Sequence, residues 1–207
     1  MISREDYLRN PCGASSLPFW KTEQMELPSN LSVYREDQFN EAFCAGIDTP
    51  YFKMIHSLQS IPQLSLPEEY EMTSADTEEL ASHIQACYES EGVTCAKLEA
   101  YRQRPVYDAA LWIAIRERKS GQIAASGIGE RDTRIGEGIL EWIQVSPDHR
   151  RRGLGRFVVC ELLYRLSKKA DFVTVSGQMN SPHNPYALYR ACGFAQPLIW
   201  HVVRHAE

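Results

Sequence analysis

The sequence lacks long apolar runs, paired cysteines and clustered histidines. Its longest apolar run, residues 109–115, is far shorter than the roughly 20 residues that a membrane helix needs. Residues 1–6 carry no apolar core of the kind found in signal peptides. We therefore expect a cytoplasmic protein with no membrane partner. The six cysteines form no Cys-x-x-Cys pair, so free and mostly buried thiols are expected, with neither a disulfide framework nor a metal site.

An excess of positive charge is also absent, because the net charge is -5. A general nucleic-acid binder is normally basic, so no nucleic-acid partner is expected. Arginines are nevertheless concentrated in residues 149–156. A basic loop on an acidic protein favours a small polyanionic ligand over a long polyanion.

Internal repeats and low-complexity tracts are absent too, and the first third of the chain differs from the rest. Residues 1–65 are rich in proline and other turn residues, with short helices expected at 37–44 and 51–60. Their aromatic side chains are too numerous for a disordered tail. We expect an ordered N-terminal extension, residues 1–65, packed on a main domain, residues 66–207.

The main domain shows a regular succession of strand and helix signals. Strands are expected at 70–73, 109–118, 122–130, 136–145, 172–175 and 194–203, of which the second to fourth form an antiparallel meander. Helices are expected after an Asp76 or Thr77 cap, at 94–104, after Pro147 with Lys168 and Lys169 in the last turn, and from Asn184 to Gly193. The order β-α-α-β-β-β-α-β-α-β predicts an α/β (α+β) fold with a mixed sheet.

Residues 150–155, Arg-Arg-Arg-Gly-Leu-Gly, join the meander to the following helix. The first N–H groups of a helix have no internal partner and carry partial positive charge. Gly153 and Gly155 have no Cβ, so a phosphate can approach the backbone closely. The loop is neither a Walker loop, since no Gly-Lys-Ser/Thr follows, nor a Rossmann fingerprint, since the third glycine is missing. An ordinary solvated basic loop remains the alternative.

Two motifs together give a more specific resemblance. Residues 145–155 resemble the central cofactor motif of the GNAT N-acetyltransferase superfamily, an arginine or glutamine followed by x-x-Gly-x-Gly/Ala. Residues 184–194 are similar to its second signature, an asparagine, a tyrosine five residues later and a closing Gly-Phe. The resemblance covers residues 66–207 and implies a GNAT-like acyl-CoA N-acyltransferase fold. It also implies an enzyme that uses acetyl-CoA as co-substrate and needs no metal.

The resemblance also implies how the co-substrate is held. In the family, the strand before the loop bulges and parts from the next parallel strand, and the pantetheine arm enters the gap. A main-chain N–H near Ile143 would then stabilise the oxyanion formed at the thioester carbonyl. Asn184 would cap its helix and touch the arm. The implied cofactor-binding residues are Ile143, Gln144, Val145, Arg150, Arg151, Arg152, Gly153, Leu154, Gly155, Arg156 and Asn184.

Two side chains are candidates for catalysis. The family counterpart of Tyr189 faces the cofactor sulfur and gives it a proton or hydrogen bond; the alternative is a core tyrosine on a short helix. An amine acceptor needs a general base, because an alkylammonium has a pKa near 10.4. Glu141 resembles the position where several family members keep that base, but a solvated strand residue or a substrate anchor fits equally well.

The predicted function is transfer of an acetyl group from acetyl-CoA to a primary amine of a small molecule or peptide, by direct attack in a ternary complex. One alternative is a non-catalytic sensor module of the same fold that binds CoA or acyl-CoA, and another is transfer to a hydroxyl or a protein N-terminus. Family members often dimerise, so a homodimer is compatible with the sequence. Residues 17–20 are expected to fill an apolar groove or shape the acceptor mouth.

Overall fold

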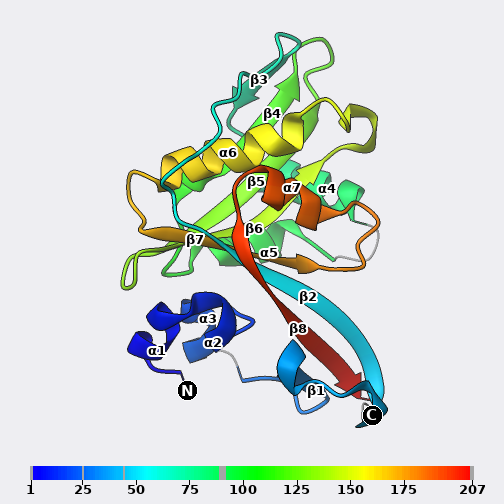
Figure 1. Cartoon of the computed structure of the whole chain (residues 1–207). Coiled ribbons are helices and arrows are strands. Elements are labelled where there is room, and N and C mark those ends of the chain that lie inside the picture. Colours follow the sequence, from blue (N-terminus) through cyan, green and yellow to red (C-terminus); the bar gives the residue numbers. More distant parts are fainter. Residues whose placement is uncertain (1, 25, 44, 89–91, 206–207) are drawn as a thin grey trace. The chain divides into compact units, whose positions relative to one another are not determined.

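The structure is a computed structural model that describes residues 2–24, 26–43, 45–88 and 92–205 (Figure 1). The chain divides into two compact units. Unit 1 comprises Met1–Ser57 and Thr174–Glu207, and unit 2 comprises Leu58–Val173.

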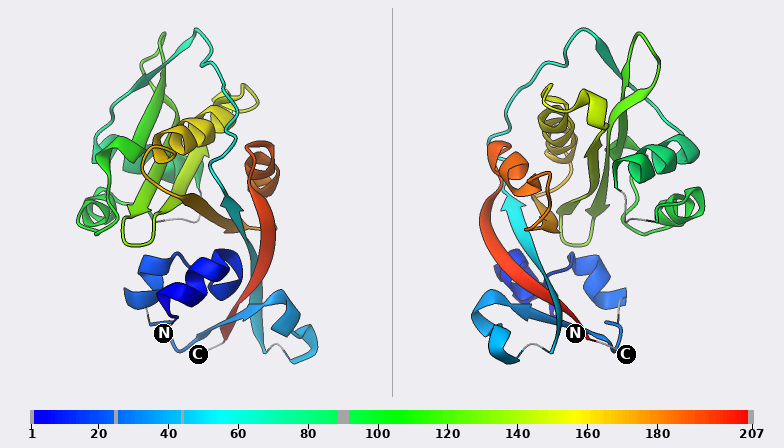
Figure 2. Two further views of the ribbon diagram at one scale, coloured as in Figure 1. Left: turned by 60° about the vertical axis from the view of Figure 1, so that its left-hand side comes forward. Right: turned by 90° about the vertical axis from the view of Figure 1, so that its right-hand side faces the viewer.

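Unit 2 is an antiparallel meander with helices on both faces. Its strands are β3 (Tyr70–Thr73), β4 (Trp112–Glu117), β5 (Ile123–Asp132) and β6 (Glu137–Val145), each antiparallel to the next. Its helices are α4 (Thr77–Cys87), α5 (Cys95–Arg102), η3 (Ala109–Leu111), η4 (Pro147–His149) and α6 (Leu154–Leu166). Strand β7 (Phe172–Gln178) begins in this unit and continues in unit 1. Helix α6 covers one face of the meander, and α4 and α5 cover the other (Figure 2).

Alternate residues of β5 face α6 on one side of the meander and α4 and α5 on the other. Gly127 lets α6 approach closely, because a Cβ there would lie 2.5 Å from a methyl carbon of Val158. The neighbouring Ile128 is buried on the other face among Leu80, Ile84 and other apolar residues of α4 and α5. The meander is therefore buried on both sides, as the long apolar stretches of its strands require.

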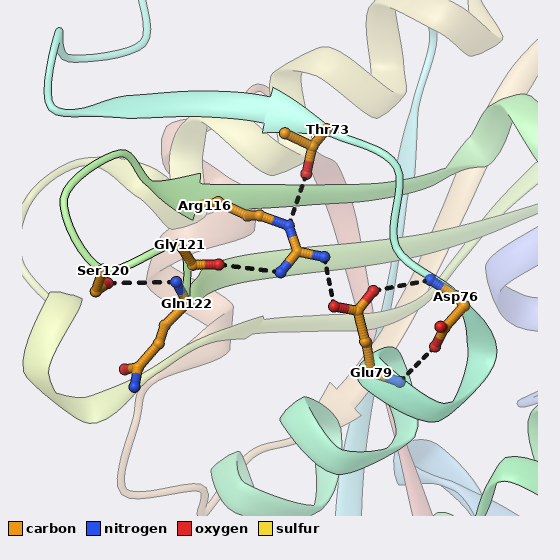
Figure 3. A network of polar contacts seen from close by, with 7 residues as sticks. All are labelled: Thr73, Asp76, Glu79, Arg116, Ser120, Gly121 and Gln122. Atoms are coloured by element: carbon orange, nitrogen blue, oxygen red, sulfur yellow. Dashed lines mark hydrogen bonds and ion pairs between the residues drawn. The ribbon is translucent and has the colours of Figure 1, made fainter.

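Helix α4 begins with a capping box (Figure 3). The Asp76 carboxylate accepts the Glu79 N–H at 2.8 Å, and the Glu79 carboxylate accepts the Asp76 N–H at 3.2 Å. The same Glu79 carboxylate also receives the Arg116 guanidinium at 2.7 Å, while Arg116 donates to the Thr73 hydroxyl at 3.1 Å. Side chains thus satisfy the start of this helix and tie it to β3 and β4.

Unit 1 joins the two ends of the chain through strand pairing. It contains α1 (Arg4–Arg9), α2 (Pro11–Ala14), α3 (Phe19–Gln24), β1 (Leu31–Arg35), η1 (Glu36–Gln38), η2 (Glu41–Phe43), β2 (Gly46–His56), α7 (Pro185–Ala191) and β8 (Ala195–His205). Strand β8 pairs antiparallel with β1 along one edge and with β2 along the other. Tyr51 of β2, for example, lies opposite Trp200 of β8.

A buried lysine ties the first helices to these strands. Lys53 of β2 is 1% exposed, and its Nζ donates to the Tyr7 hydroxyl and to the carbonyls of Pro11, Ser15 and Leu17 at 2.7–3.0 Å. A cation in the interior needs such acceptors to replace water. Phe19 and Trp20 are buried in α3. The proposed division at residues 65 and 66, and a role for residues 17–20 at an acceptor groove, stay predictions.

Several local predictions were wrong. Residues 51–60 were expected to be helical, but most of them lie in β2, because aromatic and β-branched residues pair there with β8. The helix expected at 37–44 is replaced by the short turns η1 and η2, and Cys44 lies outside the described residues. Strand β4 starts only at Trp112, since Asp108 caps η3. Helix α6 ends at Leu166, so Lys168 and Lys169 follow it.

Other predictions are confirmed. Asp76 caps α4, the three strands β4 to β6 form the meander, and α7 begins after Asn184 with Pro185 in its first turn. Gly193 follows that helix with a positive φ of 99°. The predicted mixed α/β fold is confirmed as well.

Candidate functional site

The arginine-glycine loop opens the 13-residue helix α6 without any side-chain cap. Gly153 occupies the cap position with φ 83°, in the left-handed region that favours glycine. The first helical bond after it runs from the Phe157 N–H to the Gly153 carbonyl at 3.0 Å. The amides of the three preceding residues, Leu154 to Arg156, therefore have no acceptor inside the helix. This start is suited to an anion.

The four arginines of the loop keep their positive charge. Arg150 donates from Nε to the Val145 carbonyl at 3.2 Å, and Arg152 donates to the Tyr70 hydroxyl at 3.2 Å. Arg151, Arg152 and Arg156 are exposed. None of the four forms an ion pair with a carboxylate in the described part of the chain. The loop thus presents uncompensated positive charge beside free helix amides.

Strand β6, which leads into this loop, contains a β-bulge. Trp142 lies opposite Ile128 of β5, but Leu140 lies opposite Gly129, so Glu141 is the extra residue. A bulge bends the strand and changes the direction of its side chains. Glu141 is half-buried at this point. The bulge that the resemblance implies before the loop is therefore present, and Glu141 lies in it.

After the bulge, alternate residues of β6 turn their backbone groups away from β5. The Ser146 N–H donates to the Ala124 carbonyl at 2.9 Å. Hydrogen-bonded and non-hydrogen-bonded pairs alternate in an antiparallel ladder, so Val145 and Ile143 belong to the non-bonded pairs. The partners of the two carbonyls support this assignment, because both are side chains and not groups of β5. The Ile143 carbonyl accepts from the Tyr88 hydroxyl at 3.0 Å, and the Val145 carbonyl accepts from Arg150.

Gln144 behaves differently from its two neighbours. Its side chain is 4% exposed and donates from Nε2 to the Ser126 hydroxyl. Its Oε1 is buried and has no hydrogen-bond partner within the described ranges. Gln144 was predicted to bind the cofactor, but its side chain lies in the interior of unit 2.

A buried histidine connects α4 to the first residue of the loop region. His83 Nδ1 lies 2.9 Å from the Ser126 hydroxyl, and its Nε2 lies 2.9 Å from the Ser146 hydroxyl. Ser146 donates to the Ile123 carbonyl at 3.0 Å, so its oxygen accepts the Nε2 proton of a neutral His83. Burial, helped by repulsion from His149, lowers the pKa of His83 from 6.5 to about 4.

The same burial affects the thiol at the end of α4. Cys87 Sγ lies 3.7 Å from His83 Nε2. Loss of solvent raises the pKa of the Cys87 thiol, an effect that the positive charge of Arg150 partly opposes. Cys12, Cys160 and Cys192 are also buried, whereas Cys95 is exposed, and none of these cysteines forms a disulfide in the described residues.

Tyr189 and Asn184, the remaining predicted site residues, lie in α7 of unit 1. The Asn184 side chain accepts the Ala187 N–H at 3.1 Å, so its predicted capping role is confirmed. Tyr189 is 6% exposed and packs near Phe52 and Phe194, with ring centroids 6.0 and 5.5 Å away. Its packing as a core tyrosine is established, and its role towards a sulfur stays a prediction.

The sequence analysis missed Tyr70 and His83. Their only local signals are a tyrosine at the start of a short strand and a histidine between apolar residues of α4. Both partners of each residue lie far away along the chain, so no spacing rule identifies them. No group of metal-ligating side chains occurs in the described residues. The described helices include none long and apolar enough to cross a membrane.

Comparisons with known proteins agree with this geometry. Residues 107–196 match the family described as acetyltransferase (GNAT) domain. The fold is similar to a GCN5-related N-acetyltransferase from Sphaerobacter thermophilus, with a TM-score of 0.68 and 18% identity over 89% of this chain. This chain spans 64% of that protein.

Two further solved structures have related folds. A GNAT-family acetyltransferase from Colwellia psychrerythraea has a TM-score of 0.56 and 12% identity, with 83% of this chain and 64% of that chain covered. The ribosomal-protein-S18-alanine N-acetyltransferase from Escherichia coli has a TM-score of 0.51 and 20% identity, with 67% and 95% covered. No curated protein sequence matches.

Proposed function

We propose that this chain transfers an acetyl group from acetyl-CoA to a primary amine of a small molecule or peptide, because residues 107–196 match the GNAT acetyltransferase domain. The observation that carries this proposal is the uncapped start of α6, with four arginines for which the described part of the chain provides no carboxylate partner. The arginine-glycine loop before this helix comes shortly after the bulged strand β6. Diphosphate needs the first feature, and a thioester arm that binds to backbone needs the second.

The residues fit the chemical parts of acetyl-CoA. The amides of Leu154 to Arg156 and the loop arginines bind the diphosphate and the 3′-phosphate. Pantetheine is rich in amide groups, which pair with the N–H groups of Ile143 and Val145 on the side of β6 that faces away from β5. The Ile143 N–H, which follows the bulge closely, stabilises negative charge on the thioester oxygen.

The proposed reaction is a direct aminolysis. The amine nitrogen attacks the thioester carbonyl carbon, a C–N bond forms and the C–S bond breaks. Glu141 takes the proton that the amine must lose, directly or through water. Tyr189 supplies a hydrogen bond or proton to the departing sulfur, so CoA leaves as the thiol and no oxidant or reductant is needed.

Calorimetric titration and a thiol-release assay test this proposal. Acetyl-CoA is expected to bind, and S-acetylpantetheine, which lacks the phosphates, is expected to bind at least about tenfold more weakly. Release of free thiol should then depend on one member of a panel of amines that includes polyamines, amino sugars and a peptide with an N-terminal alanine. The last is included because of the acceptor in the name of the E. coli neighbour. If neither acetyl-CoA nor CoA binds, the proposal is wrong.

A second candidate is a non-catalytic sensor of CoA or acyl-CoA. The observation in its favour is the burial of Tyr189 among Phe52 and Phe194, which gives that tyrosine a packing role of its own. Binding of acetyl-CoA without thiol release from any acceptor supports the sensor. An acceptor-dependent thiol release that falls in Glu141→Gln, with acetyl-CoA affinity unchanged, supports the enzyme.

A further inference from the structure

A single buried hydroxyl contacts two residues of the arginine-glycine loop. Tyr70 of β3 is 3% exposed, and its hydroxyl lies 3.1 Å from His149 Nδ1 and 3.2 Å from an Arg152 guanidinium nitrogen. The Tyr70 ring also meets the His149 imidazole edge to face, at 5.7 Å and 80°. An edge strand far from the loop in sequence therefore holds the loop in place.

The direction of these hydrogen bonds follows from the donor and acceptor groups. Arginine can only donate, so the Tyr70 oxygen accepts from Arg152. The single proton of the hydroxyl then goes to His149 Nδ1, which is an acceptor when the imidazole carries its proton on Nε2. The three groups form one chain, Arg152 to Tyr70 to His149, in which each bond fixes the next.

The partner of Arg152 orients the guanidinium without neutralising it. Elsewhere in unit 2, the Glu130 carboxylate holds Arg104 at 2.6 Å and the Glu79 carboxylate holds Arg116 at 2.7 Å. A phenol carries no charge at neutral pH, so Arg152 keeps its full positive charge. It also keeps the remaining four of its five N–H donors. That combination is suited to a ligand whose own negative charge completes the pair.

Arg152 differs in this respect from the other arginines of the loop. Arg150 is held by the carbonyl of Val145, a residue of the strand next to the loop. Arg151, Arg152 and Arg156 are all exposed, but for Arg151 and Arg156 no hydrogen bond to another part of the chain is found within the described residues. Of the four, Arg152 alone is held by the side chain of a distant strand.

We propose that Tyr70 is a positioning residue for phosphate binding: it holds Arg152 in advance at the start of α6, where the arginine contacts a phosphate group of acetyl-CoA. This inference rests on the proposed function. An arginine that is already ordered loses less side-chain freedom when the ligand binds. The contribution is made in the ground state and the transition state alike, so it affects KM and the dissociation constant and leaves kcat unchanged.

Tyr70→Phe is the direct test, because it removes the hydroxyl and retains the ring that contacts His149. The dissociation constant and the KM for acetyl-CoA are expected to rise about five- to tenfold, within the range for the net contribution of one ordinary hydrogen bond. Tyr164→Phe is the matched control, since Tyr164 is a 52% exposed residue of α6 outside the loop. It should bind acetyl-CoA like the wild type.

A double-mutant cycle separates positioning from a general loss of structure. In an Arg152→Ala background, Tyr70→Phe should have no further effect on affinity, because the group it orients is gone. Additive effects of the two substitutions overturn the inference, as does a Tyr70→Phe protein that binds like the wild type. Melting temperatures of all variants show whether the fold is intact.

The ligand series then identifies the phosphate involved. If Tyr70→Phe weakens acetyl-CoA and 3′-dephospho-acetyl-CoA equally, Arg152 contacts the diphosphate; if it weakens only acetyl-CoA, Arg152 contacts the 3′-phosphate. Either result supports the inference. A wild-type protein that binds no acetyl-CoA overturns the proposed function itself. Wild-type binding that Tyr70→Phe leaves unchanged overturns this inference alone.

Discussion

Two helices of unit 2 begin in opposite ways. Helix α4 starts with Asp76 and Glu79, whose carboxylates satisfy backbone N–H groups of the first turn (Figure 3). Helix α6 starts with Gly153, which offers no cap, and with arginines in place of acids. In any α-helix the first N–H groups have no acceptor within the helix and lie at the positive end of its dipole, so α4 and α6 begin with the same requirement. Side chains thus cap the start of α4, whereas the start of α6 has no side-chain cap, as the proposed binding of phosphate requires.

The largest expected effect concerns His83, which lies on α4 and bonds to Ser146 just before the loop. Its pKa is lowered from 6.5 to about 4 in the folded protein. Above pH 6.5 both states are neutral at this site. As the pH falls from 6.5 towards 4, His83 becomes protonated in the unfolded state but stays mostly neutral in the folded state. The free energy of unfolding should therefore drop by about 3 kcal/mol.

Urea unfolding at pH 7, 6, 5 and 4 measures this loss. Glutamine in His83→Gln can keep hydrogen bonds to the serines but cannot titrate. Between pH 7 and pH 4, the free energy of unfolding of this variant should therefore fall by about 3 kcal/mol less than that of the wild type. Equal pH dependence in the two proteins would contradict the lowered pKa.

The comparison can be broken by giving α6 the closed start of α4. In Gly153→Asp, the new carboxylate caps the free amides and repels phosphate, and acetyl-CoA affinity should fall at least about thirtyfold, a change of about 2 kcal/mol. Gly153→Asn is the matched control, because asparagine adopts the left-handed backbone about as readily as aspartate does and adds no charge. Calorimetry should therefore show a smaller loss for the asparagine variant. Equal losses would point to backbone strain as the cause.

The converse change opens the start of α4. Asp76→Ala removes the cap, and the free energy of unfolding should fall by about 1 kcal/mol. Since this helix start binds no ligand in the proposed function, the dissociation constant for acetyl-CoA should stay within about twofold of the wild type. Urea unfolding and calorimetry measure the two quantities, and a large loss of affinity would show that the two helix starts are not independent.

Local signals in the sequence predicted a substantial part of this arrangement. The caps at Asp76 and Asn184, the meander and the loop before α6 each depend on residues within a few positions of one another. The resemblance added the bulge in the strand before the loop, and the strand pairing shows that Glu141 lies in it. These features are recognisable because short-range hydrogen bonds and backbone preferences dominate them.

The features that were missed depend on contacts between distant residues. Residues 51–60 were expected to be helical, and the period of so short an apolar run does not distinguish a helix from a strand. Their strand state is decided by β8, whose residues lie at the other end of the chain. Tyr70 and His83 gained their roles in the same way, through partners in the loop and in β5 that the local sequence does not indicate.

The pairing of β2 with β8 has a consequence for the order in which the protein is made. Every contact inside unit 2 joins residues of one continuous stretch, so this unit can form while the ribosome is still adding the following residues. Unit 1 needs the segments on both sides of that stretch. The edge of β2 that pairs with β8 is therefore covered only after β8 has been synthesised. During synthesis, β2 is therefore a segment whose edge stays open until β8 has been made, and an open strand edge is a site where other chains can pair.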